Sequence, residues 1–184
     1  PRLARESIDV KTTEACDLAT VTEAAWNTVE TGNLELTITD SRTVHADRQR
    51  LQQVFENLFR NTVEHGVTGT QPAAEGIVPH DTSRDLARTS QTGQTASTDQ
   101  RSATTVRVGT WENGVFLEDD GPGIGPEQRE HIFEYGMSTG NSSGFGLAIV
   151  RTIIDAHGWE IDVADQTTDG ARFEITIDDS VDRP

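Results

Sequence analysis

The strongest hydrophobic pattern in the chain lies between residues 46 and 66, in "ADRQRLQQVFENLFRNTVEHG". Apolar side chains recur there every three or four positions, which is the spacing of one face of an α-helix. They are Leu51, Val54, Phe55, Leu58, Phe59 and the small Thr62. Asp47 is placed to cap the first turn, and Gly66 is placed to end the last one. The pattern therefore predicts a long amphipathic helix from Asp47 to Gly66.

Three weaker patterns also predict helices. After Asp17, a suitable N-cap, apolar residues recur at Leu18, Val21, Ala24, Ala25 and Val29. In "SSGFGLAIVRTIIDAHG", glycines lead into helical spacing at Leu147, Ile149, Val150, Ile153 and Ile154. "PEQREHIFEYG" begins with a proline at a first-turn position and predicts a short helix.

Strands are indicated where apolar and polar residues alternate. "NLELTIT" is one such stretch, and "TTVRVGTW" and "VFLEDD" form a hairpin with a turn at Asn113-Gly114. "WEIDVAD" and "ARFEITID" form a closing hairpin through "TTDG". Long helices alternating with antiparallel ribbons predict an α+β fold. We expect a two-layer α/β sandwich, with a mixed, mostly antiparallel sheet covered on one face by helices.

The periodic patterns stop between Val67 and about Ala103, where Thr, Gln, Ser, Gly, Pro and Asp dominate. Because this segment has few large apolar residues to offset its ordering entropy, residues 67–103 are predicted to form a long, mostly disordered loop. Residues 1–12 show little periodicity, and "RLARE" suggests the tail of an upstream helix or a linker. The remaining pattern predicts one domain, residues 13–180.

Carboxylates dominate the charge of the chain. Its 31 acidic and 15 basic residues give a formal charge of −16, and Lys11 is the only lysine. Such a surface repels nucleic acid and anionic lipid, so neither is predicted as a partner, and no apolar run approaches the ~18 residues of a membrane span. Cys16, the only cysteine, excludes an internal disulfide and fits a reducing interior. A carboxylate-rich, lysine-poor surface suits concentrated salt, so we hypothesise a halophilic source and a cytoplasmic location.

Two amides stand beside the apolar stripe of the long helix. Asn57 and Asn61 are four residues apart, so their side chains share one face. One interpretation is that neighbouring backbone groups satisfy both amides, as is usual for polar groups at the edge of a core. The other is that Asn61 offers its carbonyl oxygen to a hard cation such as Mg²⁺. The spacing alone leaves both open.

Acidic residues are followed directly by glycines in "EDDGPGIG", residues 118–125. A plain turn needs fewer glycines, and a calcium loop needs alternating acidic residues that this stretch lacks. A third interpretation is a strand ending in a carboxylate, Asp119, that accepts a hydrogen bond from a ligand amino group. Gly121 and Gly123 would then form a bend that admits a flat ligand, and Ile124 would be an apolar wall.

A Gly/Ser segment, "GNSSGFGLAIV", runs into the start of a predicted helix. The unpaired N–H groups and the dipole of such a helix end suit a phosphate group. By itself this signal is weak, because many helices begin after a glycine. The segment matches neither the P-loop nor the dinucleotide-binding fingerprint.

Taken in order, "LQQVFENLFRNTVEHG", "EDDGPGIG", "HIFEYG" and "SSGFGLAIV" resemble the N, G1, F and G2 boxes of the ATP-binding domain of sensor histidine kinases. The resemblance covers roughly residues 14–178, and the acidic composition is similar to that of kinases from salt-loving archaea. It implies the Bergerat-type sandwich of the gyrase, Hsp90, histidine kinase and MutL superfamily. It also implies ATP and Mg²⁺ as ligands.

The resemblance assigns roles to individual residues. Asn61 would coordinate Mg²⁺, Asn57 would face the phosphates, and both are the candidate catalytic residues. Asp119 would accept the exocyclic amino group of adenine, with His65 over the base. The remaining nucleotide contacts would come from Gly121, Gly123, Ile124, Phe133, Ser143, Gly144, Phe145, Gly146 and Leu147. A lid is expected from about Glu134 to Ser143.

The chain departs from the family pattern at three positions. Glu64 and His65 stand where many of these kinases have Lys and Tyr, and Ser142 replaces the first glycine of the G2 box. A phosphate-facing cation is therefore missing, and we expect modest ATP affinity.

The implied function is transfer of the γ-phosphoryl group of ATP to a histidine. None of the five histidines of the chain has the sequence context of an acceptor, so the acceptor is expected on a dimerisation domain outside this chain. A response regulator would be the next partner, as in two-component signal transduction. Hydrolytic cousins carry a glutamate at the position of Asn57, whereas Glu56 lies about 100° around the helix, which favours a kinase over an ATPase. Alternatives are a nucleotide-binding module without transfer activity, an anti-sigma-type serine kinase, and an ATPase of the same superfamily.

Overall fold

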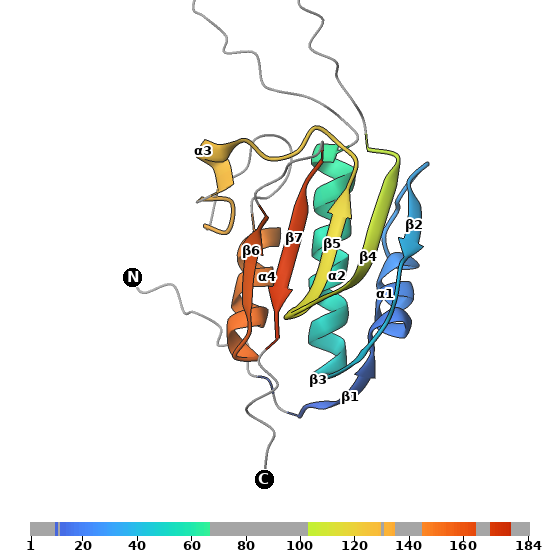
Figure 1. Ribbon diagram of the computed structural model, residues 1–184, viewed down its shortest axis with the longest axis vertical. Helices are drawn as coiled ribbons and strands as arrows, with labels where there is room; N and C mark the ends of the chain where they lie inside the picture. Colours follow the sequence, from blue (N-terminus) through green and yellow to red (C-terminus); the bar gives the residue numbers. More distant parts are fainter. Residues whose placement is uncertain are drawn as a thin grey trace, which may run out of the picture.

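The computed structural model describes residues 10, 12–66, 103–129, 131–134, 145–164 and 170–177 (Figure 1). Within these residues, a five-stranded sheet has the order β2-β4-β5-β7-β6. Its strands are β2 (Glu35–Ile38), β4 (Thr105–Trp111), β5 (Gly114–Asp119), β7 (Arg172–Thr176) and β6 (Glu160–Val163). β2 pairs with β4 in parallel, and the other neighbours are antiparallel. The predicted mixed, mostly antiparallel sheet is confirmed.

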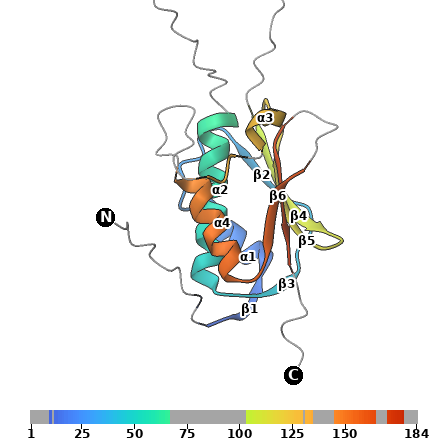
Figure 2. The same ribbon diagram turned by 90° about the vertical axis from the view of Figure 1, so that its left-hand side faces the viewer.

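Three helices cover one face of this sheet (Figure 2). They are α1 (Leu18–Trp26), α2 (Arg48–Asn61) and α4 (Gly146–Ala156), and α2 lies against both of the others. The core between the layers contains the fully buried rings of Phe55, Phe59 and Phe173. The predicted two-layer α+β sandwich is therefore confirmed, with apolar helix faces packed on apolar strand residues. In the part of the chain that the structure describes, no helix is long and apolar enough to cross a membrane.

The predicted N-caps of the first two helices are confirmed. The carboxylate of Asp17 accepts from the backbone N–H of Thr20 at 2.9 Å, and that of Asp47 accepts from the N–H of Gln49 and Arg50 at 3.1 and 3.2 Å. Each cap pairs N–H groups that a first helical turn leaves without partners. The starts of α1 and α2 were therefore predictable from these capping residues.

The end of the long helix differs from the prediction. α2 ends as an α-helix at Asn61, and Thr62–Gly66 forms a π-helical turn, η1. A π-helical turn is wider than an α-helical turn and often marks a functional site. Helical spacing of apolar residues does not distinguish the two, so the sequence pattern predicted one continuous helix.

A short ribbon of two strands was not predicted. β1 (Glu14–Asp17) pairs antiparallel with β3 (Thr43–Ala46), and Cys16 lies opposite Val44. Cys16, Val44 and Ala46 are buried, while their neighbours along the strands are exposed. Each strand has only four residues, which is too short for its alternation to stand out in the sequence.

The hairpin between β4 and β5 is confirmed, but its turn is displaced by one residue. Trp111 pairs with Gly114, so Glu112 and Asn113 form the two-residue loop rather than the expected Asn113-Gly114. Gly114 belongs to β5, where a Cβ atom would overlap the carbonyl oxygen of Ile175 on β7. The glycine therefore permits a close approach of strands instead of making the turn.

The helix predicted at "PEQREHIFEYG" is shorter than expected. α3 covers only Pro126–Arg129, and Phe133 lies in the turn that follows it. The N–H of Ile132 donates to the carbonyl of Gln128, and that of Glu134 to the carbonyl of His131 at 2.9 Å. The predicted upstream tail, apart from Val10 and Thr12, lies outside the described residues. So does the predicted loop up to Ala103, which is itself buried.

Candidate nucleotide site

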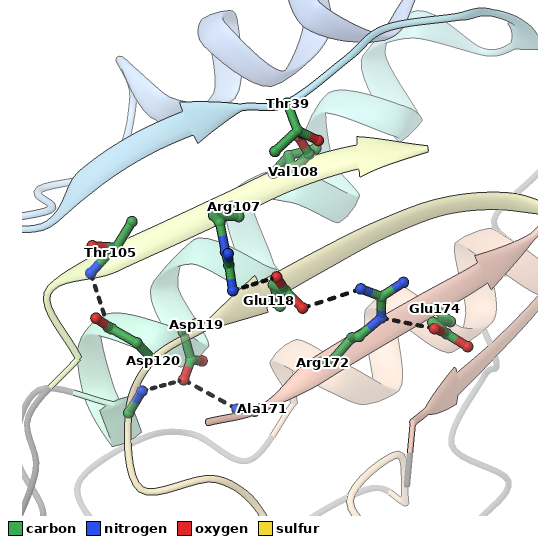
Figure 3. Close-up of polar contacts among 11 residues, drawn as sticks. Thr39, Thr105, Arg107, Val108, Glu118, Asp119, Asp120, Ala171, Arg172 and Glu174 are labelled. Carbon is green, nitrogen blue, oxygen red and sulfur yellow. Dashed lines mark hydrogen bonds and ion pairs between the residues drawn. The ribbon is translucent and has the colours of Figure 1, made fainter. Parts of the chain in front are cut away.

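Asp119, the last residue of β5, lies almost fully inside the protein, with 8% of its surface exposed. Its Oδ1 accepts from the backbone N–H of Gly121 at 2.9 Å and from that of Ala171 at 3.2 Å (Figure 3). Its Oδ2 lies 3.3 Å from the hydroxyl of Thr62, which donates to it. The candidate acceptor predicted from "EDDGPGIG" is thus a buried carboxylate held by three donors from three parts of the chain.

The surroundings of Asp119 perturb its titration. Burial, the largest effect, raises the pKa of this carboxyl, and the three hydrogen bonds oppose the rise without cancelling it. The negative charge of Asp120 adds to the increase. A buried carboxyl with a raised pKa is a common feature of functional sites.

Close backbone packing surrounds this carboxylate. Gly170, at φ 112°, lies so near that a Cβ atom there would overlap the backbone oxygen of Asp119. Gly123, at φ 76°, packs in turn on Gly170, with a Cβ atom placed 2.7 Å from its carbonyl oxygen. The two glycines predicted to form the bend therefore have different roles. Gly123 makes the bend, and Gly121 donates its N–H to Asp119.

Three contributors to this arrangement were not predicted as site residues: Thr62, Gly170 and Ala171. Thr62 looked like part of the apolar stripe, and "TTDG" looked like an ordinary turn. Only the aspartate-glycine pair, typical of positive φ, could have indicated a backbone constraint at Gly170. Nothing in the sequence pairs Ala171 with Asp119, because this contact joins the residue directly before β7 to the last residue of β5.

Asp120 also takes part, although no role was predicted for it. Its carboxylate accepts from the N–H of Thr104 at 2.7 Å and of Thr105 at 2.9 Å. Partial burial acts to raise the pKa of Asp120, but these bonds and one from the Thr104 hydroxyl outweigh it, so the pKa is lowered. Asp120 thereby ties the start of β4 to the loop after β5.

A network of charged side chains lies on the other face of the sheet. Glu118 accepts from Arg107 at 2.7 Å and from Arg172 at 3.1 Å, and Arg172 also bonds Glu174 at 2.7 Å (Figure 3). Because successive residues of a strand point to opposite faces, Glu118 joins this network while Asp119 points toward the helices.

The two asparagines of α2 behave differently. The side-chain amide of Asn57 donates to the carbonyl of Gln53 at 2.8 Å, as the structural interpretation expects. Its Oδ1 faces the start of α4, where a Cβ atom on Gly146 would lie 3.4 Å away. Within the described ranges, the half-buried Asn61 side chain has no hydrogen-bond partner, which leaves its carbonyl oxygen available.

The other predicted contacts come from several different elements. His65 is half-buried on η1, and Ile124 and Leu147 are partly buried against the core. Phe133 packs edge-on against Phe173 at 6.3 Å between ring centroids. Phe145, directly before α4, is 50% exposed. Ser143 and Gly144, and all of the predicted lid except Glu134, lie outside the described residues.

Comparison with known proteins identifies the family of this chain. The family described as "Histidine kinase-, DNA gyrase B-, and HSP90-like ATPase" matches residues 46–181. The chain belongs to this family. The match to this ATPase family begins just before α2 and includes Asp119, Gly170 and Ala171. The family predicted from the four boxes is thereby confirmed.

Individual relatives of this ATPase-family chain are sensor kinases. It is 44% identical over 70 residues to the sensor protein RstB of Escherichia coli (strain K12), covering 34% of this chain and 16% of RstB. It is 29% identical over 140 residues to the adaptive-response sensory kinase SasA of Prochlorococcus marinus (strain MIT 9303), covering 73% of this chain and 30% of SasA. The chain therefore spans less than a third of the length of these relatives.

The fold is also found in a solved structure. A mycobacterial sensor histidine kinase, MprB, superposes with a TM-score of 0.62 at 19% identity, covering 90% of this chain and 96% of the MprB chain. At this identity, the likeness supports the fold alone.

Proposed function

We propose that residues 13–180 form the ATP-binding catalytic domain of a sensor histidine kinase. This domain would bind ATP with Mg²⁺ and transfer the γ-phosphoryl group to a histidine on a dimerisation domain outside this chain. The observation that carries the proposal is the buried Asp119 carboxylate, whose Oδ1 is held by two backbone N–H groups while Oδ2 has one donor. Family membership supports the same function.

Recognition of the base would depend on Asp119. A carboxylate oxygen has two acceptor positions, so Oδ2 can take a hydrogen bond from the amino group of adenine beside that from Thr62. Gly121 and Gly123 would let the loop approach the ring, and Ile124 and His65 would supply flat or apolar contacts.

Asn61 and Asn57 would bind the phosphate and metal end of the nucleotide. A hard cation prefers oxygen ligands and keeps several waters, so one amide oxygen together with phosphate oxygens suits Mg²⁺. The suitability of this site for Mg²⁺ depends on Asn61, whose side chain has no hydrogen-bond partner among the residues that the structure describes. Those residues contain no group of three or more His, Cys, Asp or Glu side chains that could hold a metal. When bound, Mg²⁺ would neutralise charge on the triphosphate.

The first turn of α4 would contribute backbone N–H groups. Phe145 occupies the N-cap position and its side chain does not cap the helix, and the first N–H groups of a helix suit an anionic ligand. Gly146 and Leu147 begin the helix, and Ser143, Gly144 and Phe145 precede it. The short distance between Gly146 and Asn57 supports a shared phosphate site for the two helices.

The reaction would be a single transfer of the phosphoryl group. A nitrogen of the acceptor imidazole attacks the γ-phosphorus in line, the bond to the bridging oxygen breaks, and ADP leaves with that electron pair. The chain contributes positioning and charge stabilisation. Glu56, the carboxylate nearest in sequence to Asn57, accepts from Gln52 at 2.9 Å on another face of α2. This arrangement supports transfer to an acceptor over activation of water.

The partners and setting follow from this assignment. A response regulator would receive the phosphoryl group from the histidine of the dimerisation domain, in the cytoplasm, and neither nucleic acid nor a membrane would contact this segment. The net charge of −16 supports a protein adapted to high salt, similar to kinases of halophilic archaea. A melting temperature that rises between low and molar salt is expected, and a flat curve contradicts the adaptation.

The test is phosphorylation of the domain joined to its own upstream dimerisation helix, with ATP labelled at the γ-position. Acid-labile, base-stable label on the protein supports histidine transfer. Acid-stable label on a separate protein indicates a serine kinase, and release of phosphate alone indicates an ATPase. Binding of ATP with neither outcome indicates a nucleotide-binding module without transfer activity.

A further inference from the structure

Thr62 lies at the junction of the two elements that carry the site. It is the first residue of η1, directly after Asn61, and only 1% of its surface is exposed. Its hydroxyl oxygen lies 3.3 Å from Oδ2 of Asp119 and 3.4 Å from the carbonyl of Leu58. The second contact is the usual bond of a helical threonine to the preceding turn. The first joins α2 to β5.

The two oxygens of Asp119 are held differently. Oδ1 accepts from two backbone N–H groups, which use both of its acceptor positions. Oδ2 accepts from Thr62 and keeps one position for a ligand. Rotation of the carboxylate would break both bonds to Oδ1, so Oδ2 is the oxygen that a base can reach.

We propose that Thr62 is a positioning residue for base recognition, because its hydroxyl holds Oδ2 of Asp119 as the oxygen that accepts the amino group of adenine. The inference rests on the proposed ATP-binding function and adds to it a second residue that sets affinity. The hydroxyl donates to the ionised carboxylate. When Asp119 is protonated, the same hydroxyl can accept from it and donate to the carbonyl of Leu58.

The other charged groups around Asp119 do not replace this contact. The negative charge of Asp120, in the following loop, raises the pKa of Asp119 and so disfavours its ionised form. The remaining charged or titratable groups on adjoining elements are Arg48, Arg50, Glu56 and Arg60 on α2, Glu64 and His65 on η1, Arg107 on β4, Glu118 on β5, and Arg172 and Glu174 on β7. Those on the strands belong to the network on the opposite face of the sheet (Figure 3). Replacing Thr62 alters none of these groups.

The experiment compares Thr62→Val, which keeps the shape and removes the hydroxyl, with Thr62→Ser, which keeps the hydroxyl. Thr22→Val is the matched control, because Thr22 on α1 is equally buried and its hydroxyl has no partner among the described residues. ATP binding is titrated by calorimetry with Mg²⁺ between pH 5 and 8. Circular dichroism establishes that each variant is folded.

We expect Thr62→Val to weaken ATP binding about tenfold, as loss of a hydrogen bond to a charged group does. Loss of binding on acidification should occur at higher pH than in the wild type, because removing a donor favours the protonated carboxyl. Thr62→Ser should restore most of the affinity and the pH profile, and Thr22→Val should match the wild type. Protonation of the nucleotide phosphates affects all variants equally, so it does not change the difference between their pH profiles.

Two outcomes overturn different claims. If Thr62→Val binds ATP with the affinity and pH profile of Thr22→Val, while Asp119→Asn binds ATP more weakly than the wild type, Thr62 has no role in recognition and the ATP site stands. If the wild type does not bind ATP, or Asp119→Asn binds it unchanged, the proposed function itself fails.

Discussion

Replacing Gly170 by alanine tests whether the backbone contact with Asp119 builds the site. At φ 112°, an alanine is strained, and such strain costs about 1 to 3 kcal/mol. The new Cβ atom would also overlap the backbone oxygen of Asp119, so β5 and β7 must separate locally. We expect a total loss of about 3 kcal/mol or more in the free energy of unfolding, together with loss of nucleotide binding.

Gly158→Ala is the matched control. Gly158 has φ 74°, and a Cβ atom there meets nothing within 4 Å, so the substitution adds strain without overlap. Its expected cost is about 1 kcal/mol, with unchanged ATP binding. In a domain of this size, 1 kcal/mol shifts the melting temperature by roughly 2 to 4 °C, so the two variants should differ by about 4 °C or more.

The assay is thermal unfolding by circular dichroism, followed by an ATP titration at 20 °C below each midpoint. If Gly170→Ala does not fold, Gly123→Ala provides the milder case, because its Cβ atom would lie 2.7 Å from the carbonyl oxygen of Gly170. Equal melting temperatures and equal ATP affinities for the Gly170 and Gly158 variants would refute the reasoning.

Three further predictions concern single side chains. Asp119→Asn should abolish the preference for ATP over GTP in competition binding, yet melt at the same or a higher temperature at pH 7. Because the pKa of Asp119 is raised in the folded protein, its ionised form destabilises the fold above that pKa. The difference in melting temperature between variant and wild type should therefore shrink as the pH falls, and a difference that grows contradicts this. Asn61→Ala should remove the Mg²⁺ dependence of ATP binding, measured by titration with and without the metal, and a retained dependence excludes Asn61 as a ligand. His157→Ala should lower stability by about 1 to 2 kcal/mol in urea unfolding, because His157 Nε2 accepts from the N–H of Asp47 at 3.1 Å, and unchanged stability would show that water replaces the bond.

Elements with their own periodicity were predictable from the sequence. The apolar stripe of α2, the N-caps Asp17 and Asp47, and the two hairpins all follow from interactions between residues close in sequence. The π-helical turn at Thr62–Gly66 and the β1–β3 ribbon do not, because neither has a spacing that distinguishes it from a helix end or a loop.

The sequence likewise predicted some residues of the candidate site and missed others. Asp119 was identified because its stretch has an unusual composition, and Asn57 and Asn61 because they share a helix face. The hydroxyl of Thr62 and the N–H of Ala171 were missed, since they come from positions 57 and 52 residues away along the chain. Contacts between distant segments depend on strand order and on helix packing, and neither is encoded by a local pattern.

The two main-chain donors to Oδ1 of Asp119 have a consequence for sequence variation. An N–H group is supplied by every residue except proline, so Gly121 and Ala171 can change without deleting the donor, provided that the backbone keeps its path. The hydroxyl at position 62 is the only one of the three donors that substitutions other than those to proline remove directly. Selection on base affinity would therefore act on the side chain itself at position 62, and a saturation library there scored by ATP capture should retain threonine and serine above other residues.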